Sequence, residues 1–204
     1  MRKKNKMTKI IGITGGIGSG KSTLSKELRK LHFKVHDSDE EVHIMYKKPT
    51  KDFLKTLNKI GLGGSLNKKN IDKKTISKII FNNKNIKKNL ENYIFKNIRK
   101  KRSQFIKSEK RKKTKYIFLD IPLLFENDLD KACDLIVCVL AKREERFKRL
   151  SKTKKMSKKL FNKIVLTQCS DKERRKRSDI LINNNFSLKE YMFKIHKMIN
   201  KLFL

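Results

Sequence analysis

The chain has 204 residues, enough for one hydrophobic core with smaller attached parts, and its formal net charge is +35. No apolar stretch approaches the length of a membrane span or a signal-peptide core, and the three cysteines lack the C-x-x-C spacing of metal and redox sites. These features argue against a membrane or secreted protein. We expect a cytoplasmic chain with reduced thiols and no membrane partner.

The excess of Lys and Arg has two interpretations. Clustered cations attract nucleic-acid backbones, which favours an RNA-binding protein. However, the lysines are spread over the whole chain together with Asn and Ile, and A/T-rich codons encode all three, so biased base composition is the favoured explanation of the charge. Aromatic residues make up 8% of the chain and Trp is absent, which leaves little for base stacking. We expect anionic ligands but no dedicated nucleic-acid partner.

The chain begins with alternating strand and helix patterns. Residues 8–14 are short, β-branched and apolar, which predicts a buried strand. A glycine cluster follows, and then a helical pattern of leucines from Lys21 onward. A second short strand surrounds Val35 and leads into the acidic run His36-Asp37-Ser38-Asp39.

The rest of the chain alternates in the same way after one long interruption. Residues 40–114 are polar and Lys-rich with helical periodicity, which predicts a mainly helical insertion. The further predicted elements are strands at 116–119, 135–140 and 180–182, a basic helical segment at 142–178 and a closing helix from 188 to 203. Strands that alternate with helices indicate an α/β fold with a parallel sheet covered by helices.

Residues 15–22 match G-x-x-x-x-G-K-[S/T], the phosphate-binding P-loop motif, between a predicted strand and a predicted helix. Glycines let backbone N–H groups turn toward phosphate oxygens, and the helix N-terminus attracts the same anion. In this motif Lys21 reaches the β- and γ-phosphates of ATP and the Ser22 hydroxyl ligates Mg²⁺. Within the motif, the predicted ATP-binding residues are Gly16, Gly18, Ser19, Gly20, Lys21 and Ser22.

Four stretches together resemble the dephospho-CoA kinase family: ITGGIGSGKSTLSKEL, HDSD, DIPLLFEN and SDILINNN. The resemblance implies a kinase that transfers the γ-phosphate of ATP to the ribose 3′-hydroxyl of dephospho-CoA, the last step of coenzyme A synthesis. It also implies one kinase domain over residues 1–204. The domain would comprise a P-loop kinase core (8–36, 115–141 and 179–204), a helical acceptor-binding insertion (37–114) and a lid (142–178).

The resemblance further assigns roles to single residues. Asp39 would sit beside the acceptor hydroxyl as base or orienting group, with Asp37 assisting or only capping a helix. Lid arginines would stabilise charge on the transferred phosphate, and Arg149 and Arg175 are favoured over Arg174 and Arg177. The resemblance adds Thr23 and Asn184 to the predicted ATP-binding residues, with Asn184 near the adenine. The predicted acceptor-binding residues are Asp37, Asp39, Pro122, Leu123, Leu124 and Glu126, and the predicted catalytic residues are Lys21, Asp39, Arg149 and Arg175.

Several positions allow other interpretations or depart from the family pattern. Asp120 closes an apolar strand and could ligate Mg²⁺, and Leu123 and Leu124 could simply pack in the core. The chain has Phe95-Lys96 in place of a His-Pro pair, Lys73 and Thr153 in place of arginines, Ser178 in place of Ala and Phe186 in place of Gly. Two other functions stay open: a nucleoside monophosphate kinase, and a basic RNA-binding protein with an auxiliary P-loop.

Overall fold

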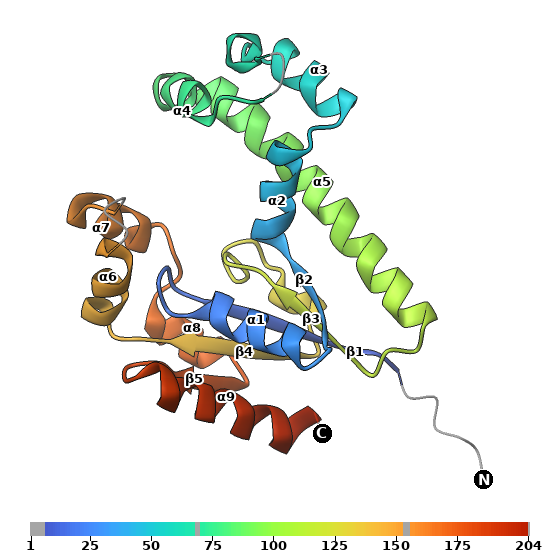
Figure 1. The fold of residues 1–204 in the computed structure, drawn as a ribbon, viewed down its shortest axis with the longest axis vertical. Coiled ribbons are helices and arrows are strands. Elements are labelled where there is room, and N and C mark those ends of the chain that lie inside the picture. The colour runs from blue at the N-terminus through green and yellow to red at the C-terminus, as the bar shows by residue number, and fades with distance from the viewer. Residues whose placement is uncertain (1–6, 68–69, 153–155, 204) are drawn as a thin grey trace. The chain divides into compact units, whose positions relative to one another are not determined.

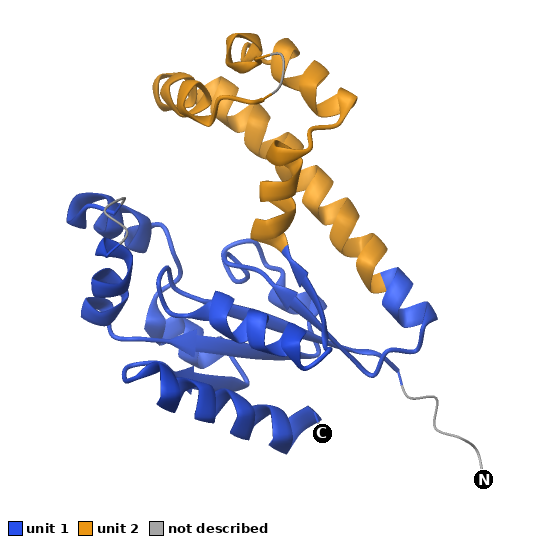
Figure 2. Cartoon of the chain, in the orientation of Figure 1, with its two compact units in different colours: residues 1–37, 107–204 blue, residues 38–106 orange. Residues whose placement is uncertain are grey.

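The computed structural model describes residues 7–67, 70–152 and 156–203. The chain divides into two compact units (Figure 2). Residues up to Asp37 and from Lys107 onward form the first, here called the sheet unit, and residues 38–106 form the second, here called the helical unit.

The sheet unit is built on five parallel strands in the order β2-β3-β1-β4-β5 (Figure 1). The strands are β1 (Lys9–Gly15), β2 (Lys34–Asp37), β3 (Tyr116–Asp120), β4 (Leu135–Leu140) and β5 (Ile180–Asn183). Both neighbours of β1 are parallel to it, so its short apolar sequence is buried from Ile10 onward. The predicted α/β fold with a parallel sheet is confirmed.

Parallel pairing brings the carboxyl ends of the strands to one edge of the sheet. Asp120, the last residue of β3, lies between its two neighbouring strands. It pairs with Ile13 of β1 on one side and with Asp37 of β2 on the other. The glycine-rich segment that follows β1 therefore starts beside the end of β3. This edge collects polar residues that are about one hundred positions apart in the sequence.

Helices of the sheet unit are α1 (Lys21–Lys30), α6 (Arg143–Ser151), α7 (Lys158–Leu166), α8 (Asp171–Arg177) and α9 (Leu188–Phe203), with a short 3₁₀ turn at Asp130–Ala132. Ser157 and Ser170 cap α7 and α8 by accepting backbone hydrogen bonds from Leu160 and Glu173. His196 Nε2 of α9 lies 2.9 Å from Glu27 Oε1 of α1, so these helices lie side by side (Figure 1).

Phe118 stands at the centre of the sheet unit's core. Its side chain is fully buried, and its ring meets those of Phe33 and Phe203 edge-on with centroids 5.3 and 5.2 Å apart. Phe118→Ala is expected to lower the free energy of unfolding by about 3–5 kcal/mol, because the cavity it leaves cannot fully collapse. Urea titration measures this loss. Phe193→Ala, at a site 67% exposed, is the control and should change stability by less than about 0.5 kcal/mol. Equal losses in both variants would contradict this description of the core.

The helical unit contains α2 (Ser38–Lys47), α3 (Lys51–Lys59), α4 (Lys73–Asn82) and most of α5 (Lys84–Arg111), with a 3₁₀ turn at Gly63–Ser65. Thr50 and Asp72 cap α3 and α4. The unit has its own core around the fully buried Phe53 and Leu57. Phe53 stacks on Tyr93, with ring centroids 5.4 Å apart. The predicted helical character of residues 40–114 is confirmed.

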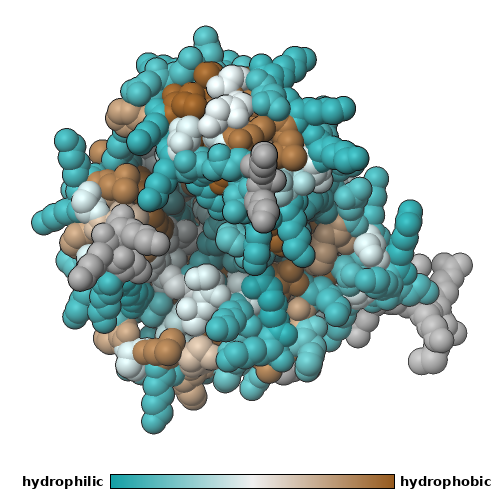
Figure 3. Space-filling model, turned by 45° about the horizontal axis from the view of Figure 1, so that its top comes forward, coloured by the Kyte–Doolittle hydropathy of each residue, from teal (hydrophilic) through white to brown (hydrophobic). Residues whose placement is uncertain are grey.

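The visible surface is mostly hydrophilic, with apolar side chains scattered over it (Figure 3). Exposed apolar residues such as Phe81 and Leu166 come from both units. No helix within the described residues combines the length and hydrophobicity that crossing a membrane requires.

Candidate active site

The segment from Gly15 to Ser22, here called the phosphate loop, connects β1 to α1 at the carboxyl edge of the sheet. Gly20 is the residue before α1 and adopts a left-handed conformation, with φ of 103°. A Cβ atom on Gly20 would lie 2.3 Å from Asn184 Nδ2, so both the backbone and the available space require glycine here. Because α1 begins at Lys21, its N-terminus opens directly onto the loop.

Lys21 forms an ion pair with Asp120, whose carboxylate also accepts a hydrogen bond from the Ser25 hydroxyl. Asp120 is only 1% exposed, and these two partners offset the cost of burying a polar group. The pair holds the Lys21 ammonium at the loop, next to the end of β3.

Asn184, which follows β5, is buried against the phosphate loop. Its Nδ2 donates to the carbonyl of Ser19 at 2.8 Å. Arg149 of α6 donates from Nη2 to the backbone carbonyl of Asn184 at 2.8 Å and to its side-chain Oδ1 at 3.3 Å. Arg149 and Asn184 thus lie together beside the loop, as a shared nucleotide site would require.

Two arginines that are almost fully buried, Arg146 and Arg174, lie against Gly16 near the start of the phosphate loop. A Cβ atom on Gly16 would lie 2.1 Å from Arg146 Nη1 and 3.3 Å from Arg174 Nη1, so both guanidiniums use the space that this glycine leaves. Asp171 accepts from Arg146 at 3.1 Å through Oδ2 and from Arg174 at 3.0 Å through Oδ1. Burial lowers the pKa of the Arg146 guanidinium, and the charge of Asp171 opposes this shift.

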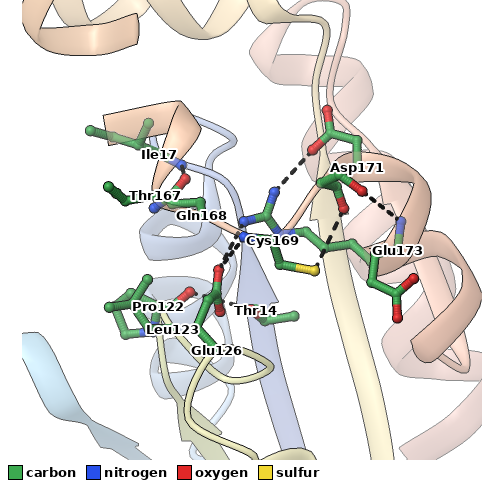
Figure 4. A network of polar contacts seen from close by, with 12 residues as sticks. Thr14, Ile17, Pro122, Leu123, Glu126, Thr167, Gln168, Cys169, Asp171 and Glu173 are labelled. Carbon is green, nitrogen blue, oxygen red and sulfur yellow. Dashed lines mark hydrogen bonds and ion pairs between the residues drawn. The ribbon is translucent and has the colours of Figure 1, made fainter. Parts of the chain in front are cut away.

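Glu126, in the loop after β3, contacts Arg174 of this arginine pair (Figure 4). Its Oε1 accepts from the backbone N–H of Cys169 at 2.6 Å and lies 3.5 Å from Arg174 Nη2. The neighbouring Gln168 accepts from the backbone N–H of Ile17 in the phosphate loop at 3.0 Å. The segment before α8 therefore contacts both the phosphate loop and the loop that carries Glu126.

Asp171→Asn tests how much the buried guanidiniums depend on this carboxylate. The change is expected to lower the free energy of unfolding by about 1–3 kcal/mol, since Arg146 and Arg174 lose their shared counter-charge while the partial exposure of Asp171 moderates the loss. Asp128→Asn is the matched control, because Asp128 pairs with Lys131 at 3.1 Å on the exposed surface. Thermal unfolding of both variants measures the difference. Equal effects would show that the arginine pair does not need Asp171.

Four side chains around the phosphate loop have buried polar atoms with no hydrogen-bond partner among the described residues: Ser19 Oγ, Arg146 Nε, Arg149 Nη1 and Arg174 Nε. Each can donate a hydrogen bond. Buried donors gathered at a glycine-rich loop suit a polyanion such as the triphosphate of ATP. Ser22 is exposed and Thr23 is half-buried in the first turn of α1, and the Ser22 hydroxyl is of the type that ligates Mg²⁺.

The residues predicted for the acceptor site lie in different environments. Pro122 and Leu123 are half-buried, and the Pro122 carbonyl lies 3.5 Å from the Thr14 hydroxyl. Leu124 is fully buried, so in this structure it packs in the interior and does not face solvent.

The two predicted acidic residues after β2 also differ. Asp37 ends β2 and accepts a hydrogen bond from Arg29 at 3.0 Å. Asp39 is exposed and lies in the first turn of α2, where an acid also stabilises the helix dipole.

Comparison with known proteins decides the family of this chain. The family model described as dephospho-CoA kinase matches residues 9–190. The chain belongs to the dephospho-CoA kinase family. It is therefore a kinase with a nucleotide-binding P-loop.

Relatives in this family align over nearly their whole length. The dephospho-CoA kinase of Fusobacterium nucleatum is 38% identical over 92% of this chain and 95% of its own length. That of Bartonella quintana is 32% identical over 95% of this chain and 98% of its own. The solved dephospho-CoA kinase from Campylobacter jejuni is 28% identical, with a TM-score of 0.72 over 96% of this chain and 98% of its own. Shikimate kinase from Bacteroides thetaiotaomicron, 14% identical with a TM-score of 0.55, shares the fold.

Among the described departures from the dephospho-CoA kinase pattern, Lys73, Phe95-Lys96 and Phe186 occupy exposed positions, whereas Ser178 is half-buried. Lys73 begins α4, and its ammonium lies 5.0 Å from the centre of the Tyr46 ring. Phe95 is 52% exposed on α5. Thr153 lies outside the described residues.

Two neighbouring arginines of residues 142–178 lie in different environments. Arg175 is exposed on α8, whereas its neighbour Arg174 turns inward to Asp171 and Gly16. For Arg174 the sequence did hold a signal: the i, i+3 spacing places Asp171 and Arg174 on one face of α8, where they can form an ion pair. Arg146 of α6 was not predicted as a site residue.

Proposed function

We propose that this chain transfers the γ-phosphate of ATP to the ribose 3′-hydroxyl of dephospho-CoA, giving coenzyme A and ADP in the cytoplasm. The observation that carries the proposal is the Lys21–Asp120 pair at a complete phosphate loop in a chain of this family. We further propose residues 37–114 as the acceptor-binding part and residues 142–178 as the lid.

In the proposed complex the phosphate loop holds the triphosphate through its backbone N–H groups and through Lys21. Phosphoryl transfer needs little covalent help, so positioning and charge stabilisation supply most of the rate. Lys21 starts beside Asp120 and needs to move only its flexible end to donate to a phosphate oxygen. Arg149 and Arg146 present buried N–H donors at the same loop that have no partner among the residues the structure describes.

Magnesium belongs to this proposal. The Ser22 hydroxyl would hold Mg²⁺, and the ion, when bound, neutralises charge on the phosphate oxygens. No group of three His, Cys, Asp or Glu side chains that could hold a metal occurs in the described parts of the chain. A site with few protein ligands suits Mg²⁺, because this ion commonly completes its coordination shell with water and phosphate oxygens.

Asp39 is proposed to orient the acceptor hydroxyl and accept its proton. Its place in the first turn of α2, directly after β2, keeps it two residues from the end of a sheet strand. Asp37 is engaged by Arg29 and is proposed to assist rather than to act as base.

An acceptor panel tests the proposal. Phosphate transfer from ATP is measured with dephospho-CoA, CMP and UMP at equal concentrations, with and without Mg²⁺. We expect Mg²⁺-dependent transfer to dephospho-CoA with a kcat/KM at least 100-fold above that for either monophosphate. Preferential transfer to CMP or UMP would instead identify a nucleoside monophosphate kinase. Tight RNA binding at moderate salt without any transfer would support the RNA-binding alternative.

A further inference from the structure

Two consecutive carbonyl groups of the phosphate loop are held by side chains from the C-terminal part of the chain. The Ser19 carbonyl accepts from Asn184 Nδ2 at 2.8 Å, and the Gly20 carbonyl accepts from the Tyr191 hydroxyl at 2.9 Å. The Gly20 carbonyl also accepts from the backbone N–H groups of Thr23 at 3.1 Å and Leu24 at 3.3 Å, in the first turn of α1. Tyr191, on α9, is not among the residues that the proposed function uses.

These contacts restrict the loop through the geometry of the peptide bond. A peptide unit is planar and trans, so its N–H and C=O groups point in opposite directions. The Ser19 carbonyl shares a plane with the N–H of Gly20, and the Gly20 carbonyl shares a plane with the N–H of Lys21. A hydrogen bond that holds each carbonyl away from the ligand side therefore also holds the next N–H group toward it.

The orientation of Asn184 is itself determined by its neighbours. Its Oδ1 accepts from Arg149 at 3.3 Å, which leaves Nδ2 as the atom that faces the Ser19 carbonyl. Its backbone N–H donates to the Leu140 carbonyl at 2.7 Å. A flipped side-chain amide would place an oxygen against the Ser19 carbonyl and an NH₂ group against Arg149, and both contacts would be repulsive.

Tyr191 is a suitable donor because the hydroxyl is the polar end of an otherwise packed side chain. It is 2% exposed, and its ring belongs to the same core as Ile195 of α9. Burial raises the pKa of Tyr191, which favours the protonated phenol that donates this hydrogen bond. Tyr191→Phe therefore removes one hydrogen bond and leaves the packing in place.

We propose that Tyr191 and Asn184 are positioning residues that hold the 19–20 and 20–21 peptide planes of the phosphate loop before ATP binds. The inference rests on the proposed function only in taking ATP as the ligand of this loop. A loop already in its binding conformation spares the ligand the cost of ordering it. When a hydrogen bond is lost, the competent conformation becomes less populated and the apparent Kd rises by the inverse of that population.

The test compares ATP binding to wild type, Tyr191→Phe and Asn184→Asp by titration calorimetry without acceptor. Tyr191→Phe is expected to raise the Kd of ATP about fivefold to tenfold, the effect of one net hydrogen bond. Asn184→Asp keeps the volume but turns an oxygen toward the Ser19 carbonyl, so its Kd should rise further. Tyr116→Phe is the matched control. It removes a hydroxyl from a half-buried tyrosine in the same unit, away from the loop, and should leave the Kd within twofold.

Kinetics separate positioning from a general loss of stability. Tyr191→Phe should raise the KM for ATP by the same factor as the Kd, while kcat at saturating ATP and the KM for dephospho-CoA stay within twofold. An unchanged Kd for ATP in folded Tyr191→Phe, or a Kd raised equally in Tyr116→Phe, would overturn the inference. If wild type binds ATP but does not phosphorylate dephospho-CoA, the proposed function fails, whereas the ratio of the Kd values still decides the role of Tyr191.

Discussion

Lys21→Met is expected to lower kcat/KM for ATP by about 10²–10³-fold, the usual loss when one preorganised charge donor is removed from a transition-state site. The side chain follows the last glycine of the phosphate loop at the N-terminus of α1, and its ammonium is held by Asp120. Methionine keeps the length of the side chain and removes its charge. Most of the loss should appear in kcat, because charge builds up on the transferred phosphate in the transition state.

Steady-state ADP release with dephospho-CoA as acceptor measures this effect. Lys26→Met is the matched control, since Lys26 is an exposed lysine on the same helix. It should keep activity within twofold. Thermal unfolding of both variants shows whether the protein loses stability when the buried Asp120 has no Lys21 partner. A wild-type kcat in Lys21→Met would show that the phosphate loop does not contribute to catalysis through Lys21.

Asp39→Asn is expected to lower kcat by about 10²–10⁴-fold, the range that a general base contributes. Asparagine keeps the size and one oxygen of the side chain but cannot accept the proton of the acceptor hydroxyl. The KM for ATP should change less than threefold, because the proposed role of Asp39 concerns the acceptor. Initial rates at saturating ATP and dephospho-CoA provide the measurement.

Glu40→Gln controls for the loss of a negative charge at the start of α2. Glu40 is the next residue, is exposed, and lies in the same first turn. Its replacement should leave kcat within twofold, and both variants should lose similar helix-dipole stabilisation. A kcat for Asp39→Asn within threefold of wild type would rule out Asp39 as the base and direct attention to Asp37.

The strands were predictable because the sheet of this protein is parallel and buried. Such strands are short continuous apolar runs, and the run Leu135–Leu140 coincides with β4. The phosphate loop was equally clear, since its glycines, Lys21 and Ser22 are specified by local chemistry. In the same way, the alternation of strands and helices indicated the fold class before any contact between them was known.

Contacts between distant segments could not be predicted in this way. Nothing in the sequence near Arg146 shows that it will face Gly16, because that contact depends on β4 lying next to β1. For the same reason, the sequence alone places Tyr191 only within the predicted closing helix at 188–203. Its hydroxyl reaches Gly20, 171 positions away, through the packing of α9 beside α1.

The different environments of neighbouring arginines on α8 could not be predicted for another reason. Four basic residues, Arg174 to Arg177, end α8, and composition does not distinguish them. Successive residues on a helix point about 100° apart, so only one of Arg174 and Arg175 can face the phosphate loop. The buried side chain is Arg174, which shares Asp171 with Arg146.

The most direct test of the central claim is the stoichiometry and position of phosphate transfer. Wild-type protein is incubated with ATP, Mg²⁺ and dephospho-CoA, and ADP and the thiol product are quantified together, with the phosphorylated position determined by ³¹P NMR. We expect one coenzyme A, phosphorylated at the ribose 3′-hydroxyl, for each ADP released, and no ADP above background without acceptor. ADP release that dephospho-CoA does not stimulate, or a product phosphorylated elsewhere, would contradict the account.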